Sequence, residues 1–353
     1  MTESVAFVTP SYRLDRDRCA LLNRSLEVCA PWAQHWIVVD RGDLRVFRFL
    51  ENERTTVVAK EDLLPVWVHR LDTLRIGLRS NVWLQARGLP MRGWLLQQLV
   101  KLALAEHVDQ DVLVCADSDV VFLRPFGVSS VVDEGDRVLL FSRPDHVDER
   151  LPTHVRWHRS AEKLLGIEGV DPPMPDFVSS LVPWKRENVL ALLEHVEATT
   201  GRHWLRALAS AWDVSEFTLY GRFAQDVLGT DAGHFVSTSP LCHDYYKHVP
   251  LSAAELDSLL DEVGPGEVAV SLTANAGMRP EQYVDVLERR WDGVAPPERP
   301  EAPAERPARR AVGGGSALPS RRGYPARLPV LLTWAVPGAM IILTLFLLQF
   351  ALD

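Results

Sequence analysis

The chain has 353 residues, of which 47% are hydrophobic and 24% charged, as in a globular protein with a substantial core. Its formal net charge is −9; residues 293–353 hold seven arginines and four acidic residues, so residues 1–292 carry −12. An acidic body of this kind argues against a nucleic-acid-binding protein, which normally presents a basic face.

Strand and helix patterns alternate along the first two thirds of the chain. Apolar runs predict strands at 5–9, 36–39, 56–59, 138–142 and 177–183, and one that begins at 112. Amphipathic patterns predict helices at 15–29, 93–108, 186–197 and 215–224. Such alternation predicts an α/β fold with a doubly wound, largely parallel, Rossmann-like sheet.

The apolar run from Val112 is followed by two carboxylates, Asp117 and Asp119. Ligands bind beyond the carboxyl ends of strands in open α/β sheets. Buried carboxylates need a counter-charge, and Mg²⁺ or Mn²⁺ takes carboxylate oxygens while sharing the remaining positions with substrate phosphates. The motif therefore predicts a metal–diphosphate site, with a turn containing two structural acids as the alternative.

Two other segments carry candidate polar residues. On the helix at 93–108, Gln98 and Lys101 lie opposite a leucine face, where Lys101 would reach a phosphate, unless this face is only solvated. Ser215 is a predicted N-cap that places Glu216 in the first helical turn, where the helix dipole favours its ionised form. Glu216 is therefore a candidate general base, with an acid that merely stabilises the helix as the alternative.

Four segments in this order resemble an uncharacterised bacterial family of glycosyltransferase-like proteins with the GT-A nucleotide-sugar fold. They are VAFVTPSYR at 5–13, GWLLQQLVKL at 93–102, DSD at 117–119 and SEFTLYG at 215–221. The resemblance covers roughly residues 5–291. It implies that Asp117 and Asp119 bind Mn²⁺ or Mg²⁺ bridging the diphosphate of a nucleotide-sugar donor, with Asp119 most directly on the metal.

The resemblance also implies roles in sugar transfer. Glu216 is our candidate general base for an inverting transfer, or a contact with acceptor or sugar. Tyr220, one helical turn later, would stack on a sugar ring or orient that carboxylate. Further candidate sugar contacts are Gln98 and Trp184, the latter at the end of the strand expected on the acceptor side.

The resemblance further implies a nucleotide site at the ends of the first strands. The residues that it points to are Thr9, Pro10, Ser11, Tyr12 and Asp40. Asp40 would bind base or ribose hydroxyls, or be a solvent-facing turn carboxylate. Many GT-A enzymes use a late histidine as a further metal ligand, which points to His243 before His234 or His248, although a structural histidine accounts for it equally well.

The C-terminal region differs from the body. Leu328–Leu352 is almost wholly apolar, and its 25 residues would span about 37 Å as a helix. Five arginines precede this run and only Asp353 follows it, so the positive-inside rule places the body in the cytoplasm. We expect a glycosyltransferase domain at 1–292, a disordered Pro/Ala/Gly/Arg-rich linker at 293–327 and a transmembrane tail anchor at 328–352, with the lipid bilayer as a partner.

These observations together predict a metal-dependent glycosyltransferase whose acceptor is a glycan, a lipid or a small molecule. A tail anchor favours a lipid-linked or envelope-precursor acceptor, because tethering raises the local concentration at the bilayer. One alternative is a haloacid-dehalogenase-like phosphatase with Asp117 as nucleophile and Asp226 and Asp231 as its later acid pair. Another is a membrane-tethered sugar-nucleotide-binding module without catalysis.

Overall fold

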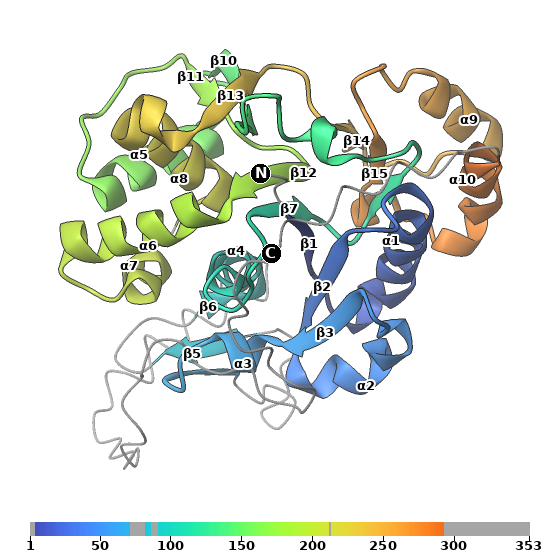
Figure 1. Ribbon diagram of the computed structural model, residues 1–353, viewed down its shortest axis with the longest axis horizontal. Coiled ribbons are helices and arrows are strands. Elements are labelled where there is room, and N and C mark those ends of the chain that lie inside the picture. Colours follow the sequence, from blue (N-terminus) through green and yellow to red (C-terminus); the bar gives the residue numbers. More distant parts are fainter. Residues whose placement is uncertain (1–3, 71–81, 86–90, 212, 293–353) are drawn as a thin grey trace.

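The computed structural model describes residues 4–70, 82–85, 91–211 and 213–292. A five-stranded sheet forms its centre, with strand order β12-β7-β1-β2-β3 (Figure 1). These strands are β12 Leu181–Lys185, β7 Val112–Ala116, β1 Val5–Pro10, β2 Gln34–Val39 and β3 Thr55–Ala59. Four of them run parallel and only β12 is antiparallel to its neighbour, which confirms the expected α/β architecture with a largely parallel sheet.

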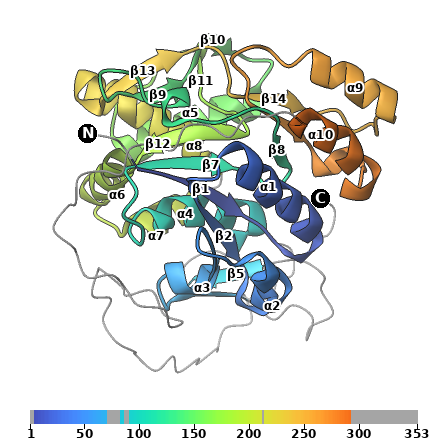
Figure 2. The ribbon, with the colours of Figure 1, turned by 45° about the vertical axis from the view of Figure 1, so that its right-hand side comes forward.

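Helices cover both faces of this sheet, as expected for strands buried along their whole length. Helix α1 (Arg16–Cys29) lies on one face and α4 (Gly93–Leu104) on the other (Figures 1 and 2). Side chains alternate along β1, so Phe7 packs in the cluster that contains leucines of α1, whereas Val8 packs in the one that contains those of α4.

The strand order fixes where a ligand would bind. From β1 the chain adds β2 and β3 on one side, and β7 then pairs with the other side of β1. The order therefore reverses between β1 and β7, and the carboxyl ends of these strands form the topological switch point. Strand β7 ends at Ala116, directly before Asp117.

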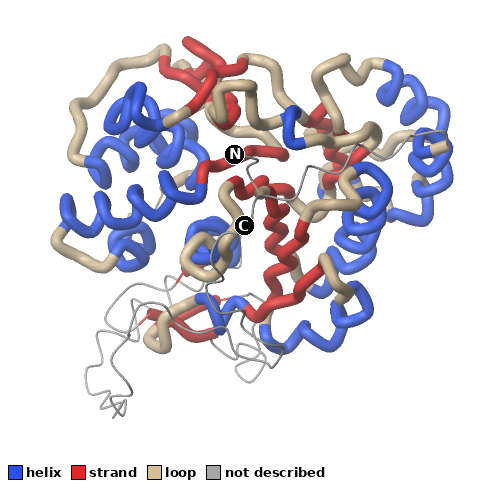
Figure 3. Tube along the Cα trace, in the orientation of Figure 1, coloured by secondary structure: helices blue, strands red, loops and turns tan. Residues whose placement is uncertain are grey.

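Two further layers flank the sheet (Figure 3). Helices α5 (Pro152–Leu165), α6 (Arg186–Thr200), α7 (Trp204–Ser210) and α8 (Glu216–Arg222) gather on the side of α4. On the other side, β14 (Cys242–Tyr245), β15 (Ala269–Leu272) and β8 (Val120–Phe122) form a small sheet near α9 (Ala253–Asp261) and α10 (Val284–Trp291). The remaining elements are α2 (Leu44–Phe47), α3 (Lys60–Leu63), β4 (Val68–Arg70), β5 (Val82–Gln85), β6 (Met91–Arg92), β9 (Val138–Phe141), β10 (Arg143–Val147), β11 (Met174–Asp176) and β13 (His234–Ser237).

Three expected elements differ in extent. The strand expected at 177–183 is β12, which starts at Leu181 and keeps Pro183 because an edge strand tolerates proline. Helix α4 ends at Leu104, four residues early, in a turn. Helix α8 ends at Arg222 and continues as a π-helical segment to Leu228.

The expected linker and tail anchor, residues 293–327 and 328–352, lie outside the described residues. Among the helices that the structure describes, none is both long and apolar enough to cross a bilayer.

Candidate functional site

Lys101 joins three elements at the switch point. Its Nζ lies 3.1 Å from Asp117 Oδ1, after β7, and 3.1 Å from Glu216 Oε1, at the start of α8. The Lys101 and Glu216 side chains are each 5% exposed, whereas that of Asp117 is 52% exposed. The ammonium also lies 4.6 Å from the centre of the Phe217 ring. Residues expected separately on a helix, a strand end and a second helix thus meet in one charged cluster.

The charge of this cluster follows from its contacts. Burial alone would lower the pKa of Lys101, but the carboxylates of Asp117 and Glu216 outweigh burial and raise it. Lys101 is therefore a fixed cation. Burial raises the pKa of Glu216, and Lys101 opposes that effect.

Glu216 is held by its backbone as well as by its side chain. The Ser215 hydroxyl accepts a hydrogen bond from the Thr218 N–H at 3.3 Å, as expected for an N-cap. The Gln98 side-chain oxygen accepts one from the Glu216 N–H at 3.1 Å. Gln98 and Lys101 are both buried, so the alternative of a solvated helix face is wrong. Gln98 positions α8, and its burial corrects the expectation of a sugar contact.

Asp119 lies at the turn between β7 and β8. Its Oδ2 accepts a hydrogen bond from the Ala274 N–H at 3.2 Å. Burial, with a further contribution from the Asp117 charge, raises the pKa of Asp119 to about 7 despite this hydrogen bond. Lys101 contacts Asp117, so it neutralises only one of the two carboxylates. A bound cation would reduce the repulsion between Asp117 and Asp119.

A third carboxylate, Asp15, approaches the same motif from the segment after β1. Burial raises the pKa of Asp15, Arg18 opposes the effect at 3.0 Å, and the charge of Asp117 adds to it. The Asp15 carboxylate also bonds the Ser118 side chain. From the sequence, Asp15 is predicted only as the start of a helix; its position shortly after the first strand is the signal that points to the site.

Asp117 and Asp119 fit a divalent cation that shares its coordination sphere with substrate. Both are hard oxygen ligands at the mouth of the sheet, and Asp117 is partly open to solvent. Within the described part of the chain, no three or more His, Cys, Asp or Glu side chains are grouped to hold a metal. Two carboxylates leave positions for phosphate oxygens and water, which suits an open site rather than a closed structural one.

The expected third ligand, His243, is oriented elsewhere. Its Nδ1 lies 3.1 Å from Glu267 Oε2. Side chains alternate along β14, and the neighbouring Cys242 and Asp244 bond each other on the opposite face. The expectation for His243 is therefore corrected to a histidine paired with Glu267.

Asp244, on the face of β14 opposite His243, interacts with Ser180. The Ser180 carbonyl accepts a 3.4 Å hydrogen bond from the Asp117 N–H, and burial raises the pKa of Asp244. The alternation of faces along the strand could have indicated Asp244 from sequence.

The end of β1 and the segment after it offer fewer side chains to a nucleotide than expected. The Thr9 side chain is fully buried and its Oγ1 lies 3.0 Å from His35 Nε2, so this hydroxyl does not face a ligand. Pro10 and Ser11 are also buried. Of the four expected residues here, only Tyr12 is partly exposed. The nucleotide-contact expectation is corrected for the side chains of the other three.

Asp40 follows β2 and forms a buried ion pair. Its Oδ1 lies 2.9 Å from Lys60 Nζ, and the two side chains are 3% and 2% exposed. The alternative of a solvent-facing turn carboxylate is therefore wrong. A direct contact with nucleotide hydroxyls is also unfavourable while Lys60 covers this carboxylate.

Trp184 and Tyr220 are core residues. They are 0% and 1% exposed, and their rings stack with centroids 5.4 Å apart. The Tyr220 hydroxyl accepts a hydrogen bond from the Lys185 N–H at 2.9 Å and lies 2.8 Å from His234 Nε2. Neither ring presents a face to a sugar, which corrects that expectation.

The acid pair of the phosphatase alternative is not assembled at the motif. Asp226 pairs with Arg222, whose Nη1 also lies 3.4 Å from Glu162 Oε1 on α5. Asp231 is exposed. Asp226 therefore belongs to a charged contact between α5 and α8 and not to the site at Asp117.

Sequence comparison matches residues 6–247 to a family described as "Family of unknown function (DUF6492)". The chain belongs to this family. Its description states no activity, and no curated protein matches the chain.

Comparison of folds finds solved glycosyltransferase structures at low similarity. The galactosyltransferase LgtC in complex with donor and acceptor sugar analogues has 10% identity and a TM-score of 0.41, over 80% of this chain and 95% of that one. An active-site mutant of LgtC has 12% identity and a TM-score of 0.42 over the same shares. The bifunctional glycosyltransferase WbbM, without ligand, has 12% identity and a TM-score of 0.43, over 83% of this chain and 50% of that one. Likeness at this level carries no information on what this chain binds.

Proposed function

We propose that this protein is a metal-dependent glycosyltransferase that moves a sugar from a nucleoside-diphosphate donor to an acceptor. One observation carries the proposal: Lys101 joins Asp117 and Glu216 at the switch point of a parallel sheet, beside a second carboxylate, Asp119. This is the position at which open α/β sheets bind ligands. Fixed cationic and anionic groups together suit a diphosphate bound with a metal ion.

Asp117 and Asp119 would hold Mg²⁺ or Mn²⁺. When bound, the ion would neutralise charge on the diphosphate leaving group. The Asp119 carboxylate is kept in place by the Ala274 N–H. Asp117 is the more exposed of the two and would be the first to meet the incoming donor.

Lys101 would donate hydrogen bonds to a donor phosphate oxygen. Its ammonium has three donors, and contacts with Asp117 and Glu216 occupy two of them. A diphosphate at Asp117 would draw Lys101 away from Glu216, because the phosphates carry more negative charge than one carboxylate.

Glu216 would then accept the proton of the acceptor hydroxyl. Its raised pKa suits a general base, and its backbone is fixed by Gln98. With Lys101 in place its side chain is only 5% exposed, so donor binding must come before acceptor deprotonation. Until the donor arrives, Glu216 therefore stays paired with Lys101 and shielded from water.

The acceptor and location belong to the same proposal. We propose a glycan, lipid-linked or small-molecule acceptor, and a body held at the cytoplasmic face of a membrane by residues 328–352. Support for this part comes from the apolar run and the arginines before it.

The direct test incubates the full-length protein with a panel of nucleotide-sugars and Mn²⁺ and measures release of nucleoside diphosphate. We expect release from at least one donor and a loss of about 10²-fold or more in Asp119→Asn, because that variant removes a metal ligand. Asp231→Asn, an exposed acid outside the cluster, is the matched control.

The same assay tests the alternatives. Hydrolysis of an aryl phosphate that falls in Asp231→Asn would favour the phosphatase. Metal-dependent nucleotide binding without release from any donor would favour a binding module. Either result contradicts the proposed transfer.

A further inference from the structure

Trp94 is an exposed aromatic residue on the helix face that leads to the carboxylate site. Residues 94, 98 and 101 follow the spacing i, i+4, i+7, so Trp94 lies on the same face of α4 as Gln98 and Lys101. At ~1.5 Å per residue, Trp94 lies ~10 Å from Lys101 along the helix axis. Gln98 and Lys101 are buried, whereas Trp94 is 49% exposed. Within two turns, this face of α4 therefore changes from buried site residues to an open aromatic ring.

The direction of α4 places this ring on the ligand side of the sheet. The Arg186 side chain donates to the Ala105 carbonyl, just after α4, at 2.9 Å, and its backbone N–H donates to the carbonyl directly before β7 at 2.8 Å. The end of α4 thus lies near the start of β7, whereas Lys101, one turn earlier, contacts Asp117 beyond the end of β7. Helix α4 therefore runs opposite to β7, and Trp94, at its start, lies towards the edge where open α/β sheets bind ligands.

Trp94 is the most exposed of three rings in contact. Its indole stacks on that of Trp157 on α5, with centroids 5.9 Å apart and planes at 25°. The His154 ring lies 4.3 Å from the Trp157 ring, and its Nδ1 lies 3.5 Å from Oδ1 of the buried Asp176. These contacts fix the position of the exposed indole. A ligand that stacks on it would therefore lose little affinity to the ordering of this side chain.

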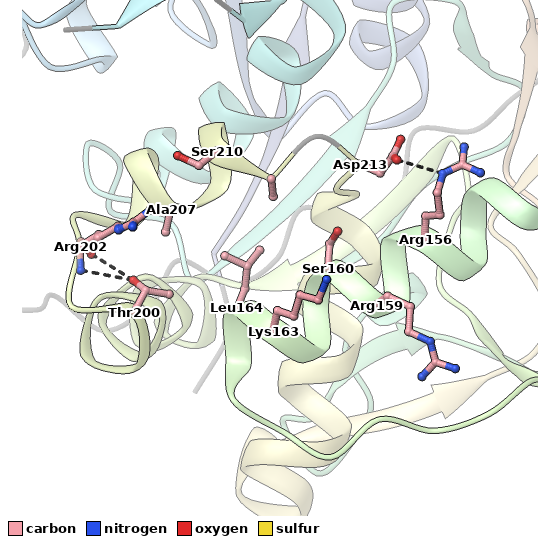
Figure 4. Close-up of a pocket in the computed structure, with 11 residues that line it drawn as sticks. Arg156, Arg159, Ser160, Lys163, Leu164, Thr200, Arg202, Ala207, Ser210 and Asp213 are labelled. Carbon is pink, nitrogen blue, oxygen red and sulfur yellow. Dashed lines mark hydrogen bonds and ion pairs between the residues drawn. The ribbon is translucent and has the colours of Figure 1, made fainter. Parts of the chain in front are cut away.

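These rings are joined at both ends to elements that hold the carboxylate site. Arg156, next to the stacked tryptophan on α5, has its Nε 2.9 Å from Asp213 Oδ2 (Figure 4). Asp213 lies three residues before Glu216, so this ion pair holds α5 beside the start of α8. Asp176, at the other end, belongs to β11, from which the chain runs into β12, the neighbour of β7.

Polar groups beside the rings indicate the kind of ligand. Arg143 and His146, both partly exposed, lie next to the Asp176 carboxylate, with Arg143 Nη2 2.7 Å from its Oδ2. Arg143 and Asp176 neutralise each other, whereas a phosphate would need an unneutralised cation. The Arg143 N–H groups and the His146 ring nitrogens can bond hydroxyl groups but would be left unpaired against an acyl chain. The C–H groups of a sugar ring pack on the electron-rich face of an indole, so this combination suits a neutral sugar.

We propose that the aromatic surface formed by Trp94, Trp157 and His154 binds a sugar ring of the acceptor. Trp94 supplies the stacking face, and Trp157 and His154 hold it in place. Sugar binding at this surface does not require the proposed transfer, but the assignment of that sugar as the acceptor rests on it. The proposal narrows the acceptor to a saccharide.

The first test measures sugar binding by saturation-transfer NMR on the full-length protein in a sugar-free detergent, with methyl glycosides of common hexoses and of their disaccharides as probes. We expect saturable binding of at least one glycoside, weakened at least 5-fold in Trp94→Ala and retained in Trp94→Tyr, which keeps an aromatic face. Phe49→Ala removes an exposed aromatic ring elsewhere and is the matched control. Equal unfolding midpoints of parent and variants ensure that lost binding reports this surface.

A second measurement separates this inference from the proposed function. Release of nucleoside diphosphate to water, without any glycoside, should be equal in Trp94→Ala and parent and should be lost in Asp119→Asn. With the bound glycoside as acceptor, Trp94→Ala should raise the KM for the glycoside at least 5-fold and leave the KM for the donor unchanged.

The outcomes distinguish the two proposals. Unchanged glycoside binding in Trp94→Ala, or no glycoside bound by the parent, overturns the sugar surface whatever the release assay shows. Glycoside binding that depends on Trp94, with no release from any donor, supports the sugar surface and overturns the transfer together with the acceptor role.

Discussion

At the scale of single residues, the buried Lys101–Glu216 pair is the feature that most constrains function. Burying two charges costs several kcal/mol per ion and is recovered only when geometry and hydrogen bonding are good. Here the ammonium has two carboxylate contacts at 3.1 Å and an aromatic face beside it. A hydrophobic pair would stabilise such a core at least as well, so stability alone does not account for these charges.

The variant Glu216→Gln tests whether Glu216 is a catalytic base or only an acid that stabilises the start of α8. The amide keeps the shape of the side chain and cannot accept the acceptor proton, so kcat should fall by roughly 10²–10⁴-fold. Affinity for nucleoside diphosphate with Mn²⁺, measured by calorimetry, should stay within about two-fold, because the metal ligands and Lys101 remain. Turnover at the parental rate would mean that Glu216 only pairs with Lys101 and caps α8, and a retaining mechanism would become the better hypothesis.

His35 carries a pH dependence of stability. It is buried between Thr9 and Asn23, at 3.0 and 2.8 Å, and burial lowers its pKa to about 3. The unfolded chain, with a histidine pKa of about 6.5, therefore binds a proton that the folded protein does not. Stability is lost as the pH falls from about 6.5 towards 3, by up to ~1.4 kcal/mol per pH unit.

Removing this histidine should flatten that slope. His35→Gln should be less stable at pH 7, because it breaks the buried network, and should lose less stability than the parent between pH 6.5 and 4.5. Urea unfolding at several pH values measures both effects, and His248→Gln, at an exposed site, should keep the parental slope. An equally steep slope in His35→Gln would show that other groups cause the acid sensitivity.

At the scale of elements, the sequence predicted those parts whose patterns are local. Strand β7, helix α4 and the Ser215 cap are local signals, and all three begin where expected. Burial of a polar helix face depends instead on what packs against it, so the locations of Gln98 and Lys101 could not be predicted. For the same reason Trp184 and Tyr220 appeared as sugar contacts: an aromatic residue in the core has the same local pattern as one in a cleft.

Helix α8 depends on a close contact at Gly221. A Cβ at this position would collide with the Phe177 ring, although the backbone has no positive φ. Gly221→Ala should therefore destabilise the fold by about 1–3 kcal/mol, despite the better helix propensity of alanine. It should also shift Glu216 at the start of the helix.

The measurement is the urea midpoint at constant m-value. Gly42→Ala is the control, because a Cβ there meets nothing within 4 Å. Replacing the ring as well, in Phe177→Leu/Gly221→Ala, should recover part of the loss. Equal stability of Gly221→Ala and Gly42→Ala would contradict the contact as the limiting feature.

At the scale of the whole molecule, charge is distributed unevenly. Residues 1–292 carry −12, whereas the last 61 residues carry +3.

The arginine asymmetry around residues 328–352 predicts the orientation of the molecule. Arg321, Arg322 and Arg327 directly precede the apolar run, so the body should stay in the cytoplasm and the C-terminus should cross the bilayer. In protoplasts treated with protease, an N-terminal epitope should survive while a C-terminal epitope is removed; after detergent, both should be digested. Moving these three arginines to the C-terminal side of the apolar run should weaken or reverse the pattern, because flanking positive charges set orientation. Digestion of the N-terminal epitope of the parent in unbroken protoplasts would overturn the topology and, with it, the expectation of a cytoplasmic donor.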